Sequence, residues 1–148
     1  MTPTHTQLEV SRTIHADRER VFDAWTDPSQ IVNWWGAGGV TCPEAEMDLV
    51  AGGTYRIANL TPSGETMWIS GTFSRVEPPS LLIYSWAMEP IDESTQHSEV
   101  EVSFDETSEG TLVTVVQTRI ASPEARETHL SGWIGCLEGL DDLLSAEN

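Results

Sequence analysis

Apolar and polar residues alternate along most of the chain, as they do in half-buried β-strands. The alternation predicts seven strands: Leu8–Ile14, Glu44–Leu49, Thr54–Leu60, Met67–Val76, one through Leu82, Tyr84 and Trp86, one through Val100, Val102 and Phe104, and one through Val113, Val115 and Gln117. Glycine and proline pairs such as Gly52-Gly53 and Pro78-Pro79 separate them and predict turns. The polar stretch Glu89–His97 predicts a loop.

Three segments carry apolar residues at helical spacing instead. Arg18–Trp25 follows Asp17, which suits an N-cap. Asp27 and Ser122 each precede a proline, a combination that begins a short second helix and a long final helix. The apolar stripe of the final helix consists of Leu130, Trp133, Ile134, Leu137, Leu140 and Leu144.

The order of these elements is one strand, two short helices, six strands and a long helix. It predicts a single α+β domain over residues 1–148, in which a curved antiparallel sheet of about seven strands wraps around the C-terminal helix. We found no internal repeat or linker.

The net charge of the chain limits the classes of molecule that it can bind. The chain has 24 acidic residues against seven arginines and no lysine, a net charge of −17. Such a surface repels phosphate groups, so we expect neither nucleic-acid nor membrane binding. It also raises the hypothesis that the host cytoplasm is salty, because salt screens self-repulsion.

The sequence predicts neither a membrane span nor a signal peptide, and the expected location of the protein follows from this. No stretch approaches the roughly 20 apolar residues that span a bilayer, and the segment Met1–Glu9 is polar and lacks the basic-then-apolar pattern of a signal peptide. We therefore expect a cytoplasmic protein. Cys42 and Cys136 are expected to be free thiols, with Cys136 packed against the core.

Several motifs resemble one family across nearly the whole chain. The segments that carry the resemblance are Val21–Pro28 with Trp34-Trp35-Gly36, Asp48 with Gly52-Gly53, Gly71–Phe73, Val76–Pro79, Leu82–Trp86 and Gly132-Trp133. They resemble proteins related to the C-terminal domain of the activator of the heat-shock-protein-90 ATPase, which belong to the START-like, helix-grip superfamily. The resemblance implies a helix-grip fold with a cavity between the long helix and the sheet, in which a small apolar ligand would bind.

The chain departs from that family at two positions. Val50 stands where members often carry an arginine, and Gln117 stands where they often carry a histidine on the last strand. The resemblance therefore implies a pocket without naming its ligand. A chaperone-linked interaction module is one alternative function, although the eukaryotic activator engages the chaperone through an additional N-terminal domain.

The candidate ligand-binding residues are aromatic or polar residues near the implied cavity. They are Trp34, Trp35, Trp68, Trp86, Gln117, His129 and Trp133. Tryptophan combines a large apolar surface with one N–H donor, which suits a flat or lipidic ligand, although plain core packing would give the same pattern. Gln117 is in phase with buried valines and must find hydrogen-bond partners, either in a ligand or in the chain.

An enzyme of the cyclase or hydrolase kind is the other alternative. We found no catalytic motif, and nothing in the sequence calls for a cofactor or a metal ion. The pocket of such an enzyme would need an ionisable residue, and the only candidates in the sequence are His97 and His129. A homodimer could form through Gly132, Gly135 and Gly139 on the final helix, although these glycines could also allow the helix to flex or reflect tolerated drift.

Overall fold

The protein, described from a computed structural model over residues 6–36, 39–89, 98–120 and 122–146, consists of seven strands and three helices in that part of the chain. The strands are β1 (Thr6–Ile14), β2 (Ala45–Met47), β3 (Thr54–Leu60), β4 (Thr66–Glu77), β5 (Leu81–Met88), β6 (Ser98–Thr107) and β7 (Gly110–Ile120). The helices are α1 (Arg18–Thr26), α2 (Pro28–Ile31) and α3 (Pro123–Ser145). The predicted α+β fold, a curved antiparallel sheet with a long C-terminal helix, is confirmed.

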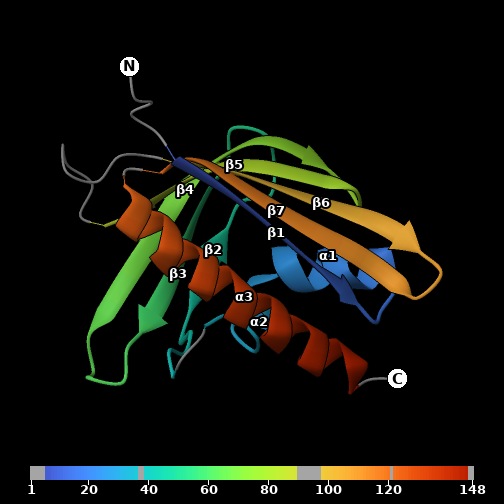
Figure 1. Ribbon diagram of the computed structural model, residues 1–148, viewed down its shortest axis with the longest axis horizontal. Helices are drawn as coiled ribbons and strands as arrows, with labels where there is room; N and C mark the ends of the chain where they lie inside the picture. Colours follow the sequence, from blue (N-terminus) through green and yellow to red (C-terminus); the bar gives the residue numbers. More distant parts are fainter. Residues whose placement is uncertain (1–5, 37–38, 90–97, 121, 147–148) are drawn as a thin grey trace.

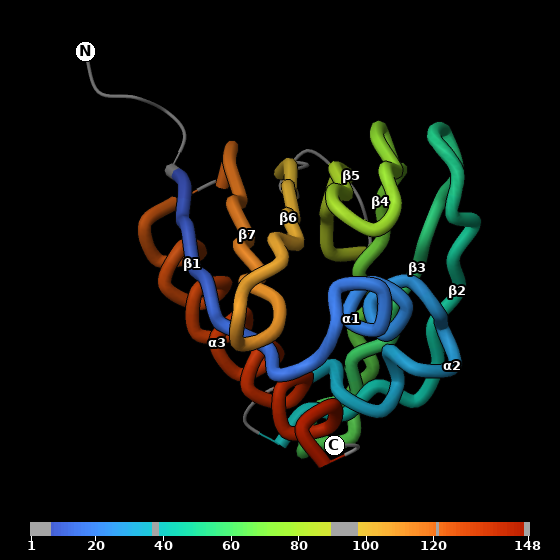
Figure 2. The backbone as a smooth tube through the Cα atoms, turned by 90° about the vertical axis from the view of Figure 1, so that its right-hand side faces the viewer, coloured from blue at the N-terminus to red at the C-terminus, as the bar shows by residue number. Residues whose placement is uncertain are grey.

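The strands form one antiparallel sheet in the order β1-β7-β6-β5-β4-β3-β2. Figure 1 shows α3 crossing the sheet diagonally, and Figure 2 shows the strands side by side from β1 to β2. α1 lies on the same side as α3, because Trp25 of α1 packs against both Phe104 of β6 and Trp133 of α3. The core lies between this helical layer and the sheet.

Local sequence accounts for most of the helix boundaries. The side chain of Asp27 accepts a hydrogen bond from the backbone N–H of Ser29, and Ser122 accepts one from Ala125, as expected of N-caps. Asp17 lies at the N-cap of α1, but its side chain makes no capping hydrogen bond. The buried residues Val21, Phe22 and others on that face hold α1 to the core instead.

The second strand is shorter than its alternation predicted. β2 ends at Met47, because the carbonyl of Asp48 already accepts a hydrogen bond from Val50 in the turn that leads to β3. Gly52 in this turn has φ of 88°, a conformation that glycine adopts without strain. The remaining strands coincide with the predicted ones to within a few residues at each end.

The glycines of α3 have different surroundings. A Cβ atom at Gly139 would lie 2.8 Å from the carbonyl oxygen of Trp34, so this glycine permits a close contact within the chain. A Cβ atom at Gly132 would meet nothing within 4 Å. A homodimer through Gly132, Gly135 and Gly139 stays a prediction. The helix face around Gly139 already packs against the backbone of Trp34 in the same chain.

None of the helices in the described part of the chain combines the length and apolarity needed to cross a membrane.

Candidate functional site

A pocket of about 160 Å³ lies between the N-terminal half of α3 and the inner face of the sheet. Four of its walls come from Trp35 after α2, Trp86 of β5, and His129 and Trp133 of α3. The other lining residues are Gly36, Val40, Asn59, Ile69, Thr128, Gly132 and Cys136. The fold therefore brings Trp35, Trp86, His129 and Trp133, which are distant in sequence, to one site.

The indoles of Trp35 and Trp133 form two walls at right angles. Their ring centroids lie 5.5 Å apart with an interplanar angle of 87°. Trp35 donates through Nε1 to Oδ1 of Asn59 at 2.9 Å, and Trp133 donates to Oε1 of Gln117 at 2.8 Å. These hydrogen bonds fix both rings and direct their apolar surfaces toward the pocket.

Trp86 differs from the other two indoles of the pocket. Its Nε1 is buried and has no hydrogen-bond partner within the described structure. Leaving a buried donor unpaired costs about 1–3 kcal/mol. Trp86 also lines a hollow of about 10 Å³ farther inside, which is at the lower limit for a single water molecule. The interior beyond the pocket is thus filled by aromatic side chains.

His129 is the ionisable residue that contacts Trp86. The two ring centroids are 4.6 Å apart and the rings are nearly perpendicular, at 80°. Burial lowers the pKa of His129 below its usual value of 6.5, because the charged imidazolium loses hydration. At neutral pH the imidazole is therefore uncharged, with one nitrogen that donates and one that accepts a hydrogen bond.

Gln117 lies behind Trp133, fully buried. Its Oε1 accepts from Trp133 and its Nε2 donates to Oγ of Ser98 at 2.8 Å, so both ends of the amide are paired within the chain. Ser98 in turn donates to the backbone carbonyl of Trp86 at 3.2 Å. Gln117 therefore positions Trp133 and does not line the pocket.

Two of the predicted ligand-binding tryptophans lie outside the pocket. Trp34 is buried in the core, where its Nε1 donates to the carbonyl oxygen of Ala24 at 2.9 Å. Trp68 neighbours Ile69 on β4, and since Ile69 faces the pocket, Trp68 points to the opposite, outer face of the sheet. There the guanidinium of Arg56 lies 3.9 Å from the centre of its ring.

Sequence reasoning missed Asn59, whose amide holds Trp35. The signal was available, because Asn59 follows Tyr55 and Ile57 in steps of two on β3 and so shares their inward face. Cys136 also lines the pocket, and the prediction that Cys42 and Cys136 are free thiols, with Cys136 packed against the core, is confirmed. Cys42 is buried as well. Burial raises the pKa of Cys136 to about 11, which keeps it a thiol. His97 lies outside the described residues.

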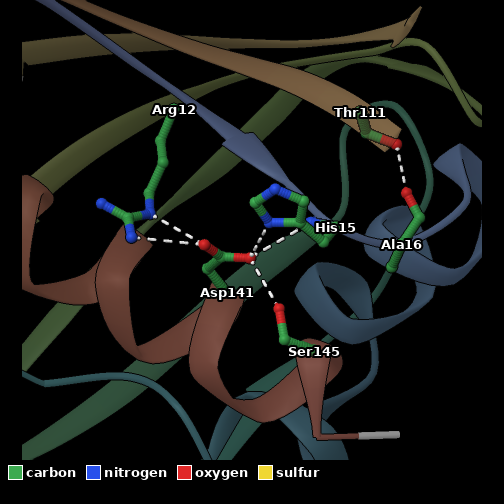
Figure 3. A network of polar contacts seen from close by, with 6 residues as sticks. All are labelled: Arg12, His15, Ala16, Thr111, Asp141 and Ser145. Carbon is green, nitrogen blue, oxygen red and sulfur yellow. Dashed lines mark hydrogen bonds and ion pairs between the residues drawn. The ribbon is translucent and has the colours of Figure 1, made fainter. Parts of the chain in front are cut away.

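A polar cluster secures the other end of α3. Asp141 is buried, and its carboxylate accepts hydrogen bonds from Arg12 of β1, from both the backbone and the ring of His15, and from Ser145 (Figure 3). Burial by itself would raise the pKa of Asp141, but these hydrogen bonds lower it overall. The cluster therefore joins the C-terminal half of α3 to the end of β1.

The fold is shared with several solved structures. The AHSA1 protein from Silicibacter pomeroyi is 21% identical with a TM-score of 0.84, covering 97% of this chain and 100% of that one. A protein from Rhodobacter sphaeroides is 26% identical with a TM-score of 0.81, covering 97% and 95%. The AHSA1-like protein from Aeromonas hydrophila is 26% identical with a TM-score of 0.79, covering 96% and 94%.

No functionally curated protein matches the sequence. Residues 15–145, by contrast, match the family described as activator of Hsp90 ATPase homolog 1-like protein. The matched range includes all three helices and the strands β2 to β7, and so contains every described residue of the pocket. This protein is therefore a member of the activator of Hsp90 ATPase homolog 1-like family.

Proposed function

We propose that this protein binds a small, mainly apolar molecule in the pocket between α3 and the sheet. The observation that carries the proposal is the aromatic pocket itself, which Trp35, Trp86 and Trp133 line together with the uncharged imidazole of His129. Ligand sites characteristically combine apolar walls with a few polar groups that orient the ligand. Thr128 and His129 bring such polar groups to the described lining.

The size of the pocket supports a ligand of roughly one ring. Its volume of about 160 Å³ is close to that of engineered cavities that bind benzene, about 150 Å³. None of its described lining residues is aspartate, glutamate or arginine. A charged ligand would consequently lose hydration without meeting an opposite charge.

Native mass spectrometry of the freshly purified protein tests the proposal, followed by extraction and identification of any molecule that travels with it. We expect a near-stoichiometric apolar compound, or quenching of tryptophan fluorescence when a library of such compounds is added. Trp86→Phe should weaken the response. Trp68→Phe is the matched control, because it removes an indole from the outer face of the same sheet.

An empty protein whose fluorescence ignores the whole library would overturn the proposal. The tryptophans would then be core residues only. The family name would in that case direct attention to interaction with a chaperone ATPase, which pull-down with purified Hsp90 would measure.

A further inference from the structure

We propose that Gly132 of α3 determines the size of the molecule that the pocket accepts, because its missing side chain leaves the space in which an apolar ring of the ligand lies. The inference rests on the proposed function and specifies which residue sets the selectivity of the pocket. Three observations support it: the position of Gly132 on the helix, the open space beside it, and a backbone conformation there that does not require glycine.

Gly132 lies on the face of α3 that lines the pocket. The residues one turn before it and one turn after it, Thr128 and Cys136, both line the pocket. His129 and Trp133 line it as well. At about 100° per residue, these five positions occupy an arc of roughly 140° around the helix, and Gly132 lies within this arc. A side chain at position 132 would therefore extend over the pocket.

The space beside Gly132 is open. A Cβ atom at this residue would meet nothing within 4 Å. A Cβ atom at Gly139, on the same helix, would instead lie 2.8 Å from the carbonyl oxygen of Trp34. Because helical side chains lean toward the N-terminus of their helix, a longer side chain at position 132 would cover the opening beside Thr128 and His129. The room in the pocket therefore depends on a residue that has no side chain.

The fold does not require glycine at this position. Gly132 lies inside α3, and it does not belong to the described glycines with positive φ, so its backbone conformation is open to any residue. Glycine in a helix interior is less favourable than alanine, because it loses more conformational freedom on folding. No backbone group approaches Gly132 as closely as the Trp34 carbonyl approaches Gly139. What the glycine provides is room in the pocket.

The part of the ligand that occupies this room is apolar. Next to Gly132, Nε1 of Trp133 already donates to Gln117 at 2.8 Å. One turn later, Sγ of Cys136 already accepts a hydrogen bond from a backbone N–H at 3.4 Å. A polar group of the ligand would lose hydration here without gaining a free partner from these two residues, whereas an apolar ring gains from its removal from water.

Benzene, a neutral probe of one-ring size, tests the proposal by titration calorimetry. Gly132→Leu should bind benzene at least about tenfold more weakly than the unmodified protein, because the new side chain occupies the space of the ring. Its melting temperature without benzene should be no lower, because leucine favours a helix and meets open space. Ser131→Leu is the matched control, since Ser131 is exposed on the same helix and is not one of the described lining residues. Its affinity for benzene should not change.

A second measurement on the unmodified protein does not depend on the folding of a variant. In a ¹⁵N-correlation spectrum we expect the assigned amide signal of Gly132 to shift when benzene is added, because the ring current of a bound ring acts on nearby protons. The amide signal of Gly139, which packs against Trp34, should move little. An unmoved Gly132 signal while benzene binds, or an unchanged affinity in Gly132→Leu, overturns the inference and leaves the pocket intact. Failure of benzene to bind the unmodified protein overturns the proposed function and the inference with it.

Discussion

Trp133 and Gln117 are joined by a buried hydrogen bond of 2.8 Å from the indole Nε1 to the amide oxygen. It is the first of three linked bonds, because Gln117 donates to Ser98 and Ser98 donates to the carbonyl of Trp86. The series connects α3 to β7, β6 and β5 behind the pocket. Two of the pocket walls, Trp86 and Trp133, are therefore held by one polar network.

Replacing Gln117 with leucine should lower the free energy of unfolding by about 1–3 kcal/mol, because Nε1 of Trp133 and Oγ of Ser98 lose a buried partner. Urea denaturation measures this loss. Gln7→Leu is the control, since the side chain of Gln7 is exposed on β1 and surface changes usually stay within about 0.5 kcal/mol. Equal stability of the two variants would show that the amide is not structurally important.

The glycines of α3 provide a matched pair on one helix. Gly139→Ala should destabilise the protein by about 1–3 kcal/mol, because overpacking forces Trp34 and the helix apart. Gly132→Ala should stabilise it by about 0.5–1 kcal/mol, because alanine favours the helix and the new methyl group meets open space. Thermal melting of both variants checks the opposite signs. Changes of the same sign would mean that the contact with the Trp34 carbonyl does not constrain position 139.

The fold was predictable to a greater extent than the site. Alternation places Leu82, Tyr84, Val100 and Val102 on the buried face, and the succession of strands and helices along the chain follows from such patterns. The order of the strands within the sheet does not, and comes from the structure. The pattern does not say how a tryptophan is paired once it is inside. Trp34 and Trp35 are adjacent, yet one donates to a backbone carbonyl in the core and the other lines the pocket.

Gln117 illustrates the same limit. Its phase on the strand predicted that it points inward, which is correct, but two partners were open: a ligand or the chain itself. The choice depends on Trp133 and Ser98, which approach Gln117 from other elements. Trp68 was assigned to the pocket by position in the family pattern, whereas the alternation with Ile69 already places it on the opposite face.

Asp141 should be sensitive to loss of its charge. Asp141→Asn should lower the free energy of unfolding by about 1.5–3 kcal/mol, because hydrogen bonds from Arg12 and His15 to a carboxylate are stronger than those to an amide. Asp142→Asn on the exposed side of the same helix removes the same charge and should change stability little. Guanidinium denaturation compares the two. An equal loss in both would attribute the effect to net charge and not to the cluster.

His129 should make stability depend on pH in the mildly acidic range. Burial lowers its pKa in the folded protein from 6.5, so the unfolded chain binds the proton first as the pH falls. The contribution of the neutral imidazole is therefore complete above about pH 6.5 and is lost as the pH decreases through the folded pKa. Denaturation curves at several pH values should show a smaller decrease in His129→Gln than in the unmodified protein. Parallel profiles would contradict this assignment.

The excess of acidic residues should make stability depend on salt. At a net charge of −17 the folded state is strained by repulsion, and this repulsion weakens as the Debye length falls from about 10 Å at 0.1 M to about 3 Å at 1 M salt. We expect the melting temperature to rise with potassium chloride over this range. Sucrose is the control, because it raises stability without screening charge. A midpoint that does not move with salt would refute adaptation to a salty cytoplasm.

The Asp141 cluster (Figure 3) also limits where α3 could move if the pocket were to widen, because it holds the C-terminal half of the helix to the end of β1. It fixes α3 at one end, whereas His129, twelve residues earlier and about 18 Å along the helix axis, lies over the pocket. If α3 tilted by about 10° about Asp141, the helix axis at His129 would move by about 3 Å, given a rise of 1.5 Å per residue. Trp133 lies on the part of α3 that would move. Such a tilt would therefore have to break the hydrogen bond from Trp133 to Gln117.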